Sequence, residues 1–304
     1  TSSLHPENFM ATRALVLGGG GPVGIAWETG LAAGLAEGGV NVGEADFIMG
    51  TSAGSAVGAQ LAMGRTPQQM YAAIAADATD TRPGPTRANT GEGGAPPNLM
   101  PLMELMQKAQ RDDVSQEAVL KEIGAFALAA KTMSEDAFIA TFGRMLASAE
   151  SWPSRRYLCT SVDALTGEFQ PWDNDSGVPL SRAIASSCSV PGVYPPITIK
   201  GRRYIDGGMR SGTNADLAKG YDTVVVVAVT TAAEGPAADR SRQRLEAELD
   251  VLRSSGSTVH VLSPDAASQA AFGVNLMDFT KRAGAAEAGL AQGRAEAARI
   301  AGGW

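Results

Sequence analysis

A short stretch near the start of the chain has the residue types of a nucleophile site. Residues 50–54 read Gly-Thr-Ser-Ala-Gly and fit the pattern G-x-S-x-G, in which a serine is turned outward between a strand and a helix. Apolar residues precede the motif, and small, helix-compatible residues follow it, as that arrangement requires. We therefore predict that Ser52 is a nucleophile and that Gly50 and Gly54 keep the tight turn free of Cβ atoms.

A run of four glycines, residues 18–21, could supply a second part of such a site. It follows the apolar residues 13–17 and precedes a helix predicted from Pro22 to about Glu37. Consecutive glycines leave backbone N–H groups uncovered at the start of a helix, where they can stabilise an oxyanion. Two neighbouring parallel strands would place this turn beside Ser52.

The same run also matches the dinucleotide-binding fingerprint G-x-G-x-x-G at Gly19, Gly21 and Gly24. That fingerprint needs an acidic residue at the end of the second strand to bind the ribose hydroxyls. Here the only acid of that strand, Asp46, stands at its start. A non-enzymatic binder of a nucleotide or an acyl ligand is therefore an alternative that the sequence disfavours.

A serine nucleophile needs a base, and the sequence leaves two kinds of candidate open. The chain has two histidines, His5 near the amino terminus and His260 inside an apolar strand, and a histidine base would make the protein an α/β-hydrolase. Asp206 ends another predicted strand and is followed by two glycines, so its partly desolvated carboxylate could act as the general base. A carboxylate base predicts activity well below pH 6, whereas an imidazole base loses activity as the pH falls through about 6.5.

Composition restricts the partners of the protein. The chain has 304 residues, is 44% hydrophobic, and carries a formal net charge of −7 with a pI near 5.0. A protein this acidic is not expected to bind nucleic acid or to adsorb to anionic lipid through charge alone. We therefore predict that the substrates are neutral or zwitterionic esters.

The two cysteines, Cys159 and Cys188, are too few for a disulfide framework or a zinc site. We expect two reduced thiols in the core, with neither metal nor cofactor. The amino-terminal residues lack a basic run followed by an apolar core, and no stretch reaches the roughly 18 apolar residues of a membrane span. The sequence thus predicts a cytoplasmic protein that contacts a membrane surface only transiently; its oligomeric state is left open.

The elements that must position these residues alternate between strand and helix patterns. They predict a single α/β domain over residues 1–304 with a mostly parallel central sheet. Residues 223–229 form a continuous apolar run, as a buried parallel strand does, and a turn at residues 163–167 predicts a hairpin. Residues 80–150 form a predicted helical insertion within this domain.

The insertion contains a segment that could cover the site. A Pro- and Gly-rich stretch at residues 81–97 is followed by Leu99, Leu102, Met103 and Met106, whose spacing predicts an amphipathic helix. Such a stripe more often packs into a core than forms a mobile lid. The stripe therefore predicts either a helix packed into the core, which is favoured, or a mobile lid over the site.

Taken together, the sequence resembles the patatin-like phospholipase family from Ala14 to Lys219. The resemblance rests on the glycine loop at residues 18–24, the serine motif at residues 50–54, the segment 185–195, and Asp206-Gly-Gly with Asn214 beyond it. The chain departs from the family pattern at Val23, where members usually carry Arg or Lys, which implies altered electrostatics in the glycine loop.

The resemblance implies a fold, a mechanism and a substrate class. It makes Ser52 the nucleophile, Asp206 its partner in a Ser–Asp dyad without histidine, and Gly19, Gly20 and Gly21 part of the oxyanion loop. It also implies a three-layer sandwich and the hydrolysis of fatty-acyl esters of phospholipids or other lipids, without a metal.

Overall fold

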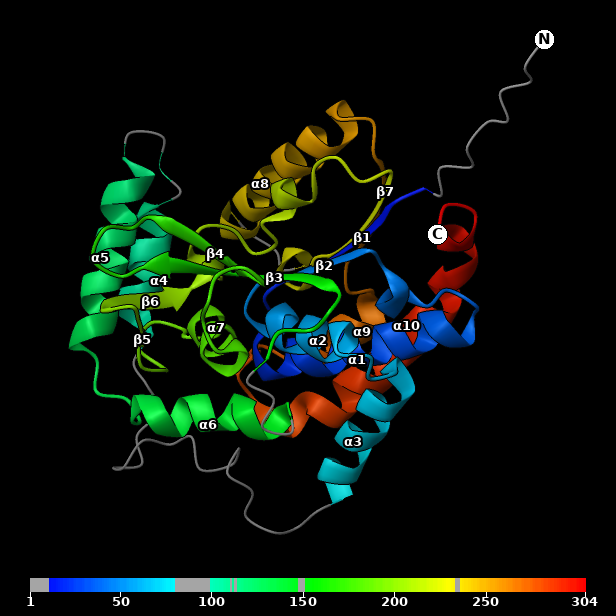
Figure 1. Ribbon diagram of the computed structural model, residues 1–304, viewed down its shortest axis with the longest axis horizontal. Coiled ribbons are helices and arrows are strands. Elements are labelled where there is room, and N and C mark those ends of the chain that lie inside the picture. The colour runs from blue at the N-terminus through cyan, green and yellow to red at the C-terminus, as the bar shows by residue number, and fades with distance from the viewer. Residues whose placement is uncertain (1–10, 80–98, 110, 112–113, 147–150, 233–235) are drawn as a thin grey trace.

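The central element of the protein is an eight-stranded mixed sheet, seen edge-on in the computed structural model (Figure 1). The structure describes residues 11–79, 99–109, 111, 114–146, 151–232 and 236–304. The strand order is β5-β6-β3-β2-β1-β7-β8, and β4 pairs with β3. The parallel strands are β1 (Arg13–Leu17), β2 (Phe47–Gly50), β3 (Arg156–Asp163), β7 (Thr223–Val227) and β8 (Thr258–Leu262). The antiparallel strands are β4 (Phe169–Asp173), β5 (Ile197–Ile199) and β6 (Arg202–Asp206).

The middle of this sheet is apolar on both faces because helices cover both faces. Every residue of β7 is buried, as the continuous apolar run predicts for a central parallel strand. Alternate residues of β1 join different clusters: Leu15 and Leu17 pack on one side of the sheet, and Ala14 and Val16 on the other. The three-layer arrangement expected from the sequence is thus confirmed.

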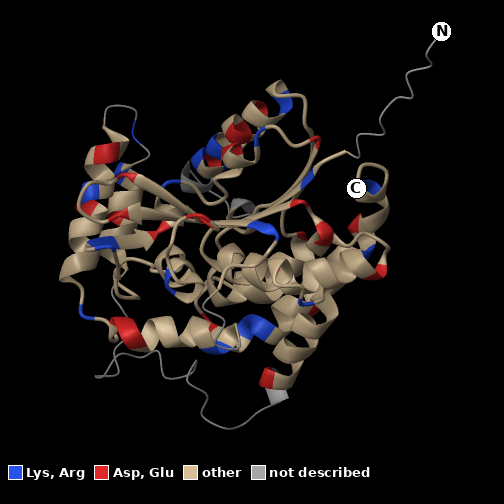
Figure 2. Cartoon of the chain, in the orientation of Figure 1, with Lys and Arg blue, Asp and Glu red and all other residues tan. Residues whose placement is uncertain are grey.

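Most helices lie on the face that carries the larger core (Figure 1). They are α1 (Gly21–Glu37), α2 (Ala53–Ala62), α3 (Pro67–Thr79), α6 (Glu135–Met145), α7 (Leu180–Ser187), α9 (Ala266–Phe272) and α10 (Arg282–Ala301). The opposite face is covered by α8 (Pro236–Ser254), and next to it by α4 (Met100–Lys108) and α5 (Gln116–Ala129). Charged residues are frequent along α8, which is an outer helix (Figure 2).

The predicted helical insertion supplies helices to both faces of the sheet. Leu102 of α4 is buried against α5, as the core interpretation of the stripe requires. Met103 and Met106 of the same helix are 63% and 37% exposed, so the stripe is only partly buried. The Pro- and Gly-rich stretch at residues 81–97 lies outside the described residues, and the lid remains a prediction.

Two further expectations can be compared with the structure. Cys159 and Cys188 are buried, and neither forms a disulfide. No helix in the described part of the chain combines the length and the apolar character needed to cross a bilayer.

Candidate active site

The serine motif and the glycine loop meet at the carboxyl ends of β1 and β2. The two strands are parallel, and Leu17 pairs with Gly50, so the segments that follow them leave the sheet side by side. Ser52 has φ 53° and ψ −118°, a left-handed conformation that is strained for a residue with a side chain. Such strain is typical of a nucleophile elbow, in which the serine stands between a strand and a helix.

Both glycines of the motif are required by close backbone contacts. A Cβ atom on Gly50 would lie 2.3 Å from the carbonyl carbon of Gly54, and one on Gly54 would lie 2.2 Å from the carbonyl oxygen of Leu17. Relief of these contacts would displace the start of α2 or the end of β1. The sequence-based reason for these two glycines therefore agrees with the packing of the turn.

Helix α7 holds the elbow from the other side. The Ser52 N–H donates to Ser187 Oγ at 3.0 Å, and the Cys188 thiol donates to the Ser52 carbonyl oxygen at 3.1 Å. Ser55 Oγ donates to the same carbonyl at 2.6 Å. These bonds fix the backbone of Ser52, and Ser52 also lines a cavity.

Asp206 reaches the same edge of the sheet because β6 runs antiparallel to β3. Gly50 of β2 pairs with Cys159 of β3, and Asp206 of β6 pairs with Ser161, which is two residues further along β3. The end of β6 therefore returns to the carboxyl end of β2, where the elbow begins. The sheet topology brings together two residues that are 154 positions apart in sequence.

The carboxyl group of Asp206 is buried and only partly hydrogen-bonded. Its Oδ1 accepts the Gly208 N–H at 2.7 Å, and its Oδ2 has no partner of regular hydrogen-bond geometry among the described residues. Burial raises the pKa of Asp206 to about 7, and the Ser52 side chain and the Gly208 N–H, both donating toward it, limit the rise. The Ser52 side chain and the Gly208 N–H are thus the two groups that offset the effect of burial on this carboxyl group.

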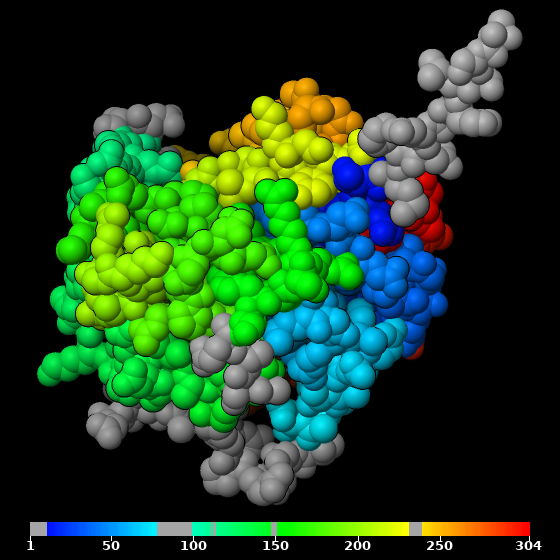
Figure 3. All heavy atoms as spheres, viewed as in Figure 1, coloured from blue at the N-terminus to red at the C-terminus, as the bar shows by residue number. Residues whose placement is uncertain are grey.

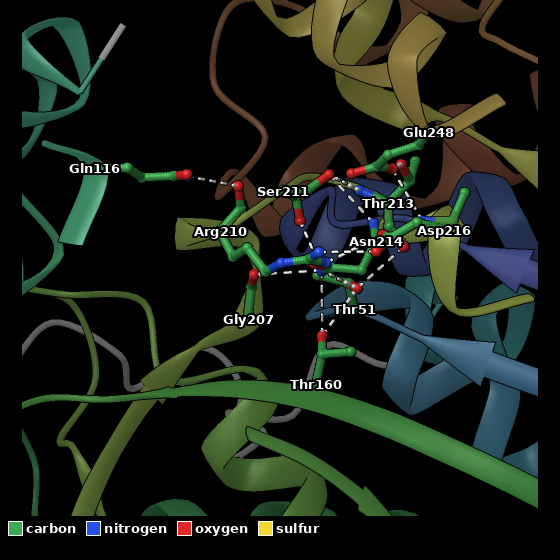
Figure 4. A network of polar contacts seen from close by, with 11 residues as sticks. Thr51, Gln116, Thr160, Gly207, Arg210, Ser211, Thr213, Asn214, Asp216 and Glu248 are labelled. Carbon is green, nitrogen blue, oxygen red and sulfur yellow. Dashed lines mark hydrogen bonds and ion pairs between the residues drawn. The ribbon is translucent and has the colours of Figure 1, made fainter. Parts of the chain in front are cut away.

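A polar network includes Thr51 and Gly207, the residues next to Ser52 and Asp206 in the chain (Figure 4). Asn214, in a left-handed conformation, donates from Nδ2 to Thr51 Oγ1 at 3.0 Å and to the Gly207 carbonyl at 3.3 Å. Arg210 donates to Asn214 Oδ1 at 2.8 Å and thereby fixes the orientation of the amide. Thr51 precedes the serine and Gly207 follows the aspartate, so one side chain links the two halves of the site.

The glycine loop offers fewer free donors than its sequence suggests. Gly19 N–H donates to the Gly212 carbonyl at 2.8 Å. No hydrogen bond among the described residues uses the N–H groups of Gly20, Gly21 or Ala53. Ala53 is the first residue of α2 and lines the cavity together with Gly21 and Ser52.

The cavity in front of Ser52 has a volume of about 580 Å³. Its walls are mainly apolar faces of α3 and α6, among them Met70, Ile74, Phe138 and Phe142. In the space-filling view the surface is hollowed between α3, in cyan, and α6, in green (Figure 3). A cavity of this size is large enough for one small or drug-sized ligand.

Two residues singled out in the sequence lie away from this site. His260 is on β8, which β7 and β1 separate from β2, so about 14 Å of sheet lies between the two strands. Its Nε2 faces Gly303 instead. Val23 is fully buried in the core beside Trp27, so its side chain contributes nothing to the cavity wall.

Sequence reasoning did not identify several groups at the site. Ser187 and Cys188 lie within the segment that carries the resemblance, but only the fold shows that they hold the elbow. Ala53 has no chemical signal of its own, although its position directly after the nucleophile is informative once an elbow is suspected. Glu28 of α1 is buried near Gly18, and burial raises the pKa of its carboxyl group well above the usual range.

The described residues contain no group of three or more His, Cys, Asp or Glu side chains that could hold a metal ion.

A three-layer α/β fold with a serine elbow beside a buried aspartate defines the structural class of the protein. The sequence profile described as Patatin-like phospholipase matches residues 15–219, which is more than half of the chain. The protein belongs to the patatin-like phospholipase family, and this membership supports a lipid hydrolase.

Similar solved structures include two bacterial proteins. VipD from Legionella pneumophila is 15% identical with a TM-score of 0.47, and the match covers 95% of this chain and 67% of that one. The type III effector protein ExoU is 13% identical with a TM-score of 0.38, and the match covers 95% of this chain and 53% of that one. A search of curated proteins found no match.

Proposed function

We propose that the protein is a lipid acyl hydrolase that cleaves fatty-acyl esters through a dyad of Ser52 and Asp206. The observation that carries the proposal is the strained serine elbow facing an apolar cavity, with a buried and incompletely hydrogen-bonded carboxylate behind it. An acyl chain needs apolar walls, and a serine hydroxyl needs a base. A nucleotide binder would need neither.

In the proposed first step, the Asp206 carboxylate takes the proton of the Ser52 hydroxyl while Oγ attacks the ester carbonyl carbon. A pKa of about 7 for Asp206 suits a base that works near neutral pH. The carbonyl oxygen becomes an oxyanion, for which the N–H groups of Gly20, Gly21 and Ala53 are the proposed donors. The amino end of α2 adds a partial positive charge.

Collapse of this intermediate breaks the ester bond, and the leaving alcohol takes the proton from Asp206. The acyl group stays on Ser52 Oγ as an ester. Asp206 then removes a proton from water, whose oxygen attacks the acyl carbonyl, and Ser52 recovers its proton as the fatty acid leaves. In this scheme Gly19 shapes the loop but donates no hydrogen bond to the oxyanion.

The test is hydrolysis of p-nitrophenyl esters of increasing chain length, and of phosphatidylcholine, by wild type and Ser52→Ala. Loss of a serine nucleophile should lower turnover by about 10⁴-fold or more without unfolding the protein. Ser254→Ala, at the exposed end of α8, is the matched control and should behave as wild type. Undiminished turnover by Ser52→Ala, with both variants folded by circular dichroism, would overturn the proposal.

A further inference from the structure

The cavity in front of Ser52 carries a charge opposite to that of the whole chain. Arg65, Arg144 and Arg282 all line it, and among the described residues that line it Asp77 is the one acid. The chain as a whole has a net charge of −7. Because salt screens exposed charges beyond about 10 Å, a ligand inside the cavity is affected mainly by these local arginines.

The three arginines are incompletely neutralised. Arg65 donates one hydrogen bond to the neutral Gln60 side chain and has no carboxylate partner among the described residues. Arg144 is exposed at the end of α6 and likewise forms no ion pair within the described part of the chain. Arg282 contacts Asp77 at 3.5 Å, but the Asp77 side chain is 69% exposed, so solvent weakens this pair.

A guanidinium group beside apolar walls is well suited to bind an anion. It offers five N–H donors in a planar fork that matches the oxygens of a phosphate. Attraction is stronger there than in bulk water, because the apolar walls lower the local dielectric constant. Figure 2 shows the basic end of α6 beside α3, at the same place where Figure 3 shows the hollow.

The position of Arg65 after α2 restricts the ligand further. Helix α2 rises about 15 Å between Ser52 and Ala62, and Arg65 follows shortly after. Its long side chain covers part of that distance, which leaves room for an anionic group a few bonds from the reacting carbonyl. The cavity volume of about 580 Å³ suits one acyl chain with a small head group better than a two-chain lipid.

We propose that the preferred substrates are single-chain acyl esters whose head group carries a phosphate and a net negative charge. This rests on the proposed hydrolase function and names its substrate class. It reverses the preference for neutral or zwitterionic esters expected from the net charge. The three arginines attract the phosphate while the carbonyl lies at Ser52, and their excess positive charge selects against a head group that also carries a cation, such as choline.

The test compares palmitoyl lysophosphatidylglycerol with palmitoyl lysophosphatidylcholine, which share an acyl chain and differ in net charge. We expect wild-type kcat/KM to be about tenfold higher for the anionic lipid. Each of Arg65→Gln, Arg144→Gln and Arg282→Gln should lower the ratio of the two values about five- to tenfold, which corresponds to about 1 to 1.4 kcal/mol. Arg144→Lys should retain part of the preference because it keeps the charge.

Arg253→Gln is the control, because Arg253 is on α8 on the opposite face of the sheet and the substitution removes the same charge. It should leave the ratio unchanged. A wild-type ratio of one or less, or an equal fall of the ratio in Arg253→Gln, would overturn the inference about the substrate. Hydrolysis of p-nitrophenyl butyrate by the same protein would still support the proposed hydrolase function. If inorganic phosphate inhibited as strongly as the anionic lipid, the site would be one for free phosphate and not for a lipid head group.

Discussion

At the residue scale, the proposed base is a buried carboxylate that forms no ion pair within the described part of the chain. Burial raises the pKa of Asp206 to about 7 from a usual value of 3.8, so its ionised form is unfavourable in the folded protein. Between pH 3.8 and about pH 7, Asp206 is therefore protonated in the folded state and ionised in the unfolded state. The stability of the wild type should therefore fall as the pH rises through this window.

Asp206→Asn should separate stability from activity. The amide that replaces the carboxyl group cannot take a proton from Ser52, so turnover should be abolished. The amide is also uncharged, so its burial does not carry the cost of desolvating an ionised carboxylate. The free energy of unfolding of the variant, relative to wild type, should rise by on the order of 4 kcal/mol between pH 4 and pH 7 and then level off. Urea unfolding at a series of pH values measures this; a difference independent of pH would mean that Asp206 is not strained by burial.

The pH profile of activity follows from the same shift. Asp206 must be ionised to act as a base, so kcat/KM for a neutral p-nitrophenyl ester should fall as the pH drops through about 7. This differs from the expectation from sequence that a carboxylate base works well below pH 6, because Asp206 is fully buried and not only partly desolvated. Full activity at pH 5 would contradict the assignment of Asp206 as the base.

At the scale of elements, the elbow is a contact between two βα units. The Gly54 N–H donates to the Gly18 carbonyl at 3.0 Å, so the start of α2 is bonded to the glycine loop ahead of α1. The sequence motif specified the residues of each turn. It could not specify this contact, because that depends on β1 and β2 being neighbours.

Gly54→Ala tests how tightly the two units approach. Its Cβ would lie 2.2 Å from the Leu17 carbonyl oxygen, so we expect a loss of about 3 kcal/mol or more in stability together with loss of esterase activity. Gly284→Ala, in α10 with no atom within 4 Å of its Cβ, is the control. It should be neutral or stabilising by up to about 1 kcal/mol, because alanine favours a helix; equal losses in both variants would contradict the packing described.

At the scale of the whole molecule, the order of the strands decides which candidate base can act. Residue patterns located β1, β2, β7 and β8 within the chain, because their apolar runs and glycine turns are local signals. They did not give the order of these strands in the sheet. Whether His260 or Asp206 lay near Ser52 was thus open in the sequence and depends on long-range pairing.

His260→Gln should retain most esterase activity, because β7 and β1 separate its strand from that of the elbow. A steady-state assay with a p-nitrophenyl ester, beside circular dichroism to confirm folding, is sufficient. Severe loss of activity in a folded His260→Gln protein would require a different base and would favour the histidine-dependent alternative.

The proposed preference for anionic substrates also depends on the fold of the whole molecule. Net charge is a property of the whole sequence, whereas Arg65, Arg144 and Arg282 come from three separate segments that only the fold brings to one cavity. Val23 was the local departure that the sequence offered, and it is buried in the core. Composition is therefore a poor guide to the electrostatics of this site.

The most direct test of the central claim is to find which residue reacts with a fluorophosphonate probe. The protein is incubated with the probe and digested, and the modified peptide is identified by mass spectrometry. The dyad predicts a single rapid adduct on Ser52, with slow labelling of Asp206→Asn and none of Ser52→Ala. Rapid modification of a different serine, or equal labelling of the Ser52→Ala protein, would contradict the proposal that Ser52 is the nucleophile.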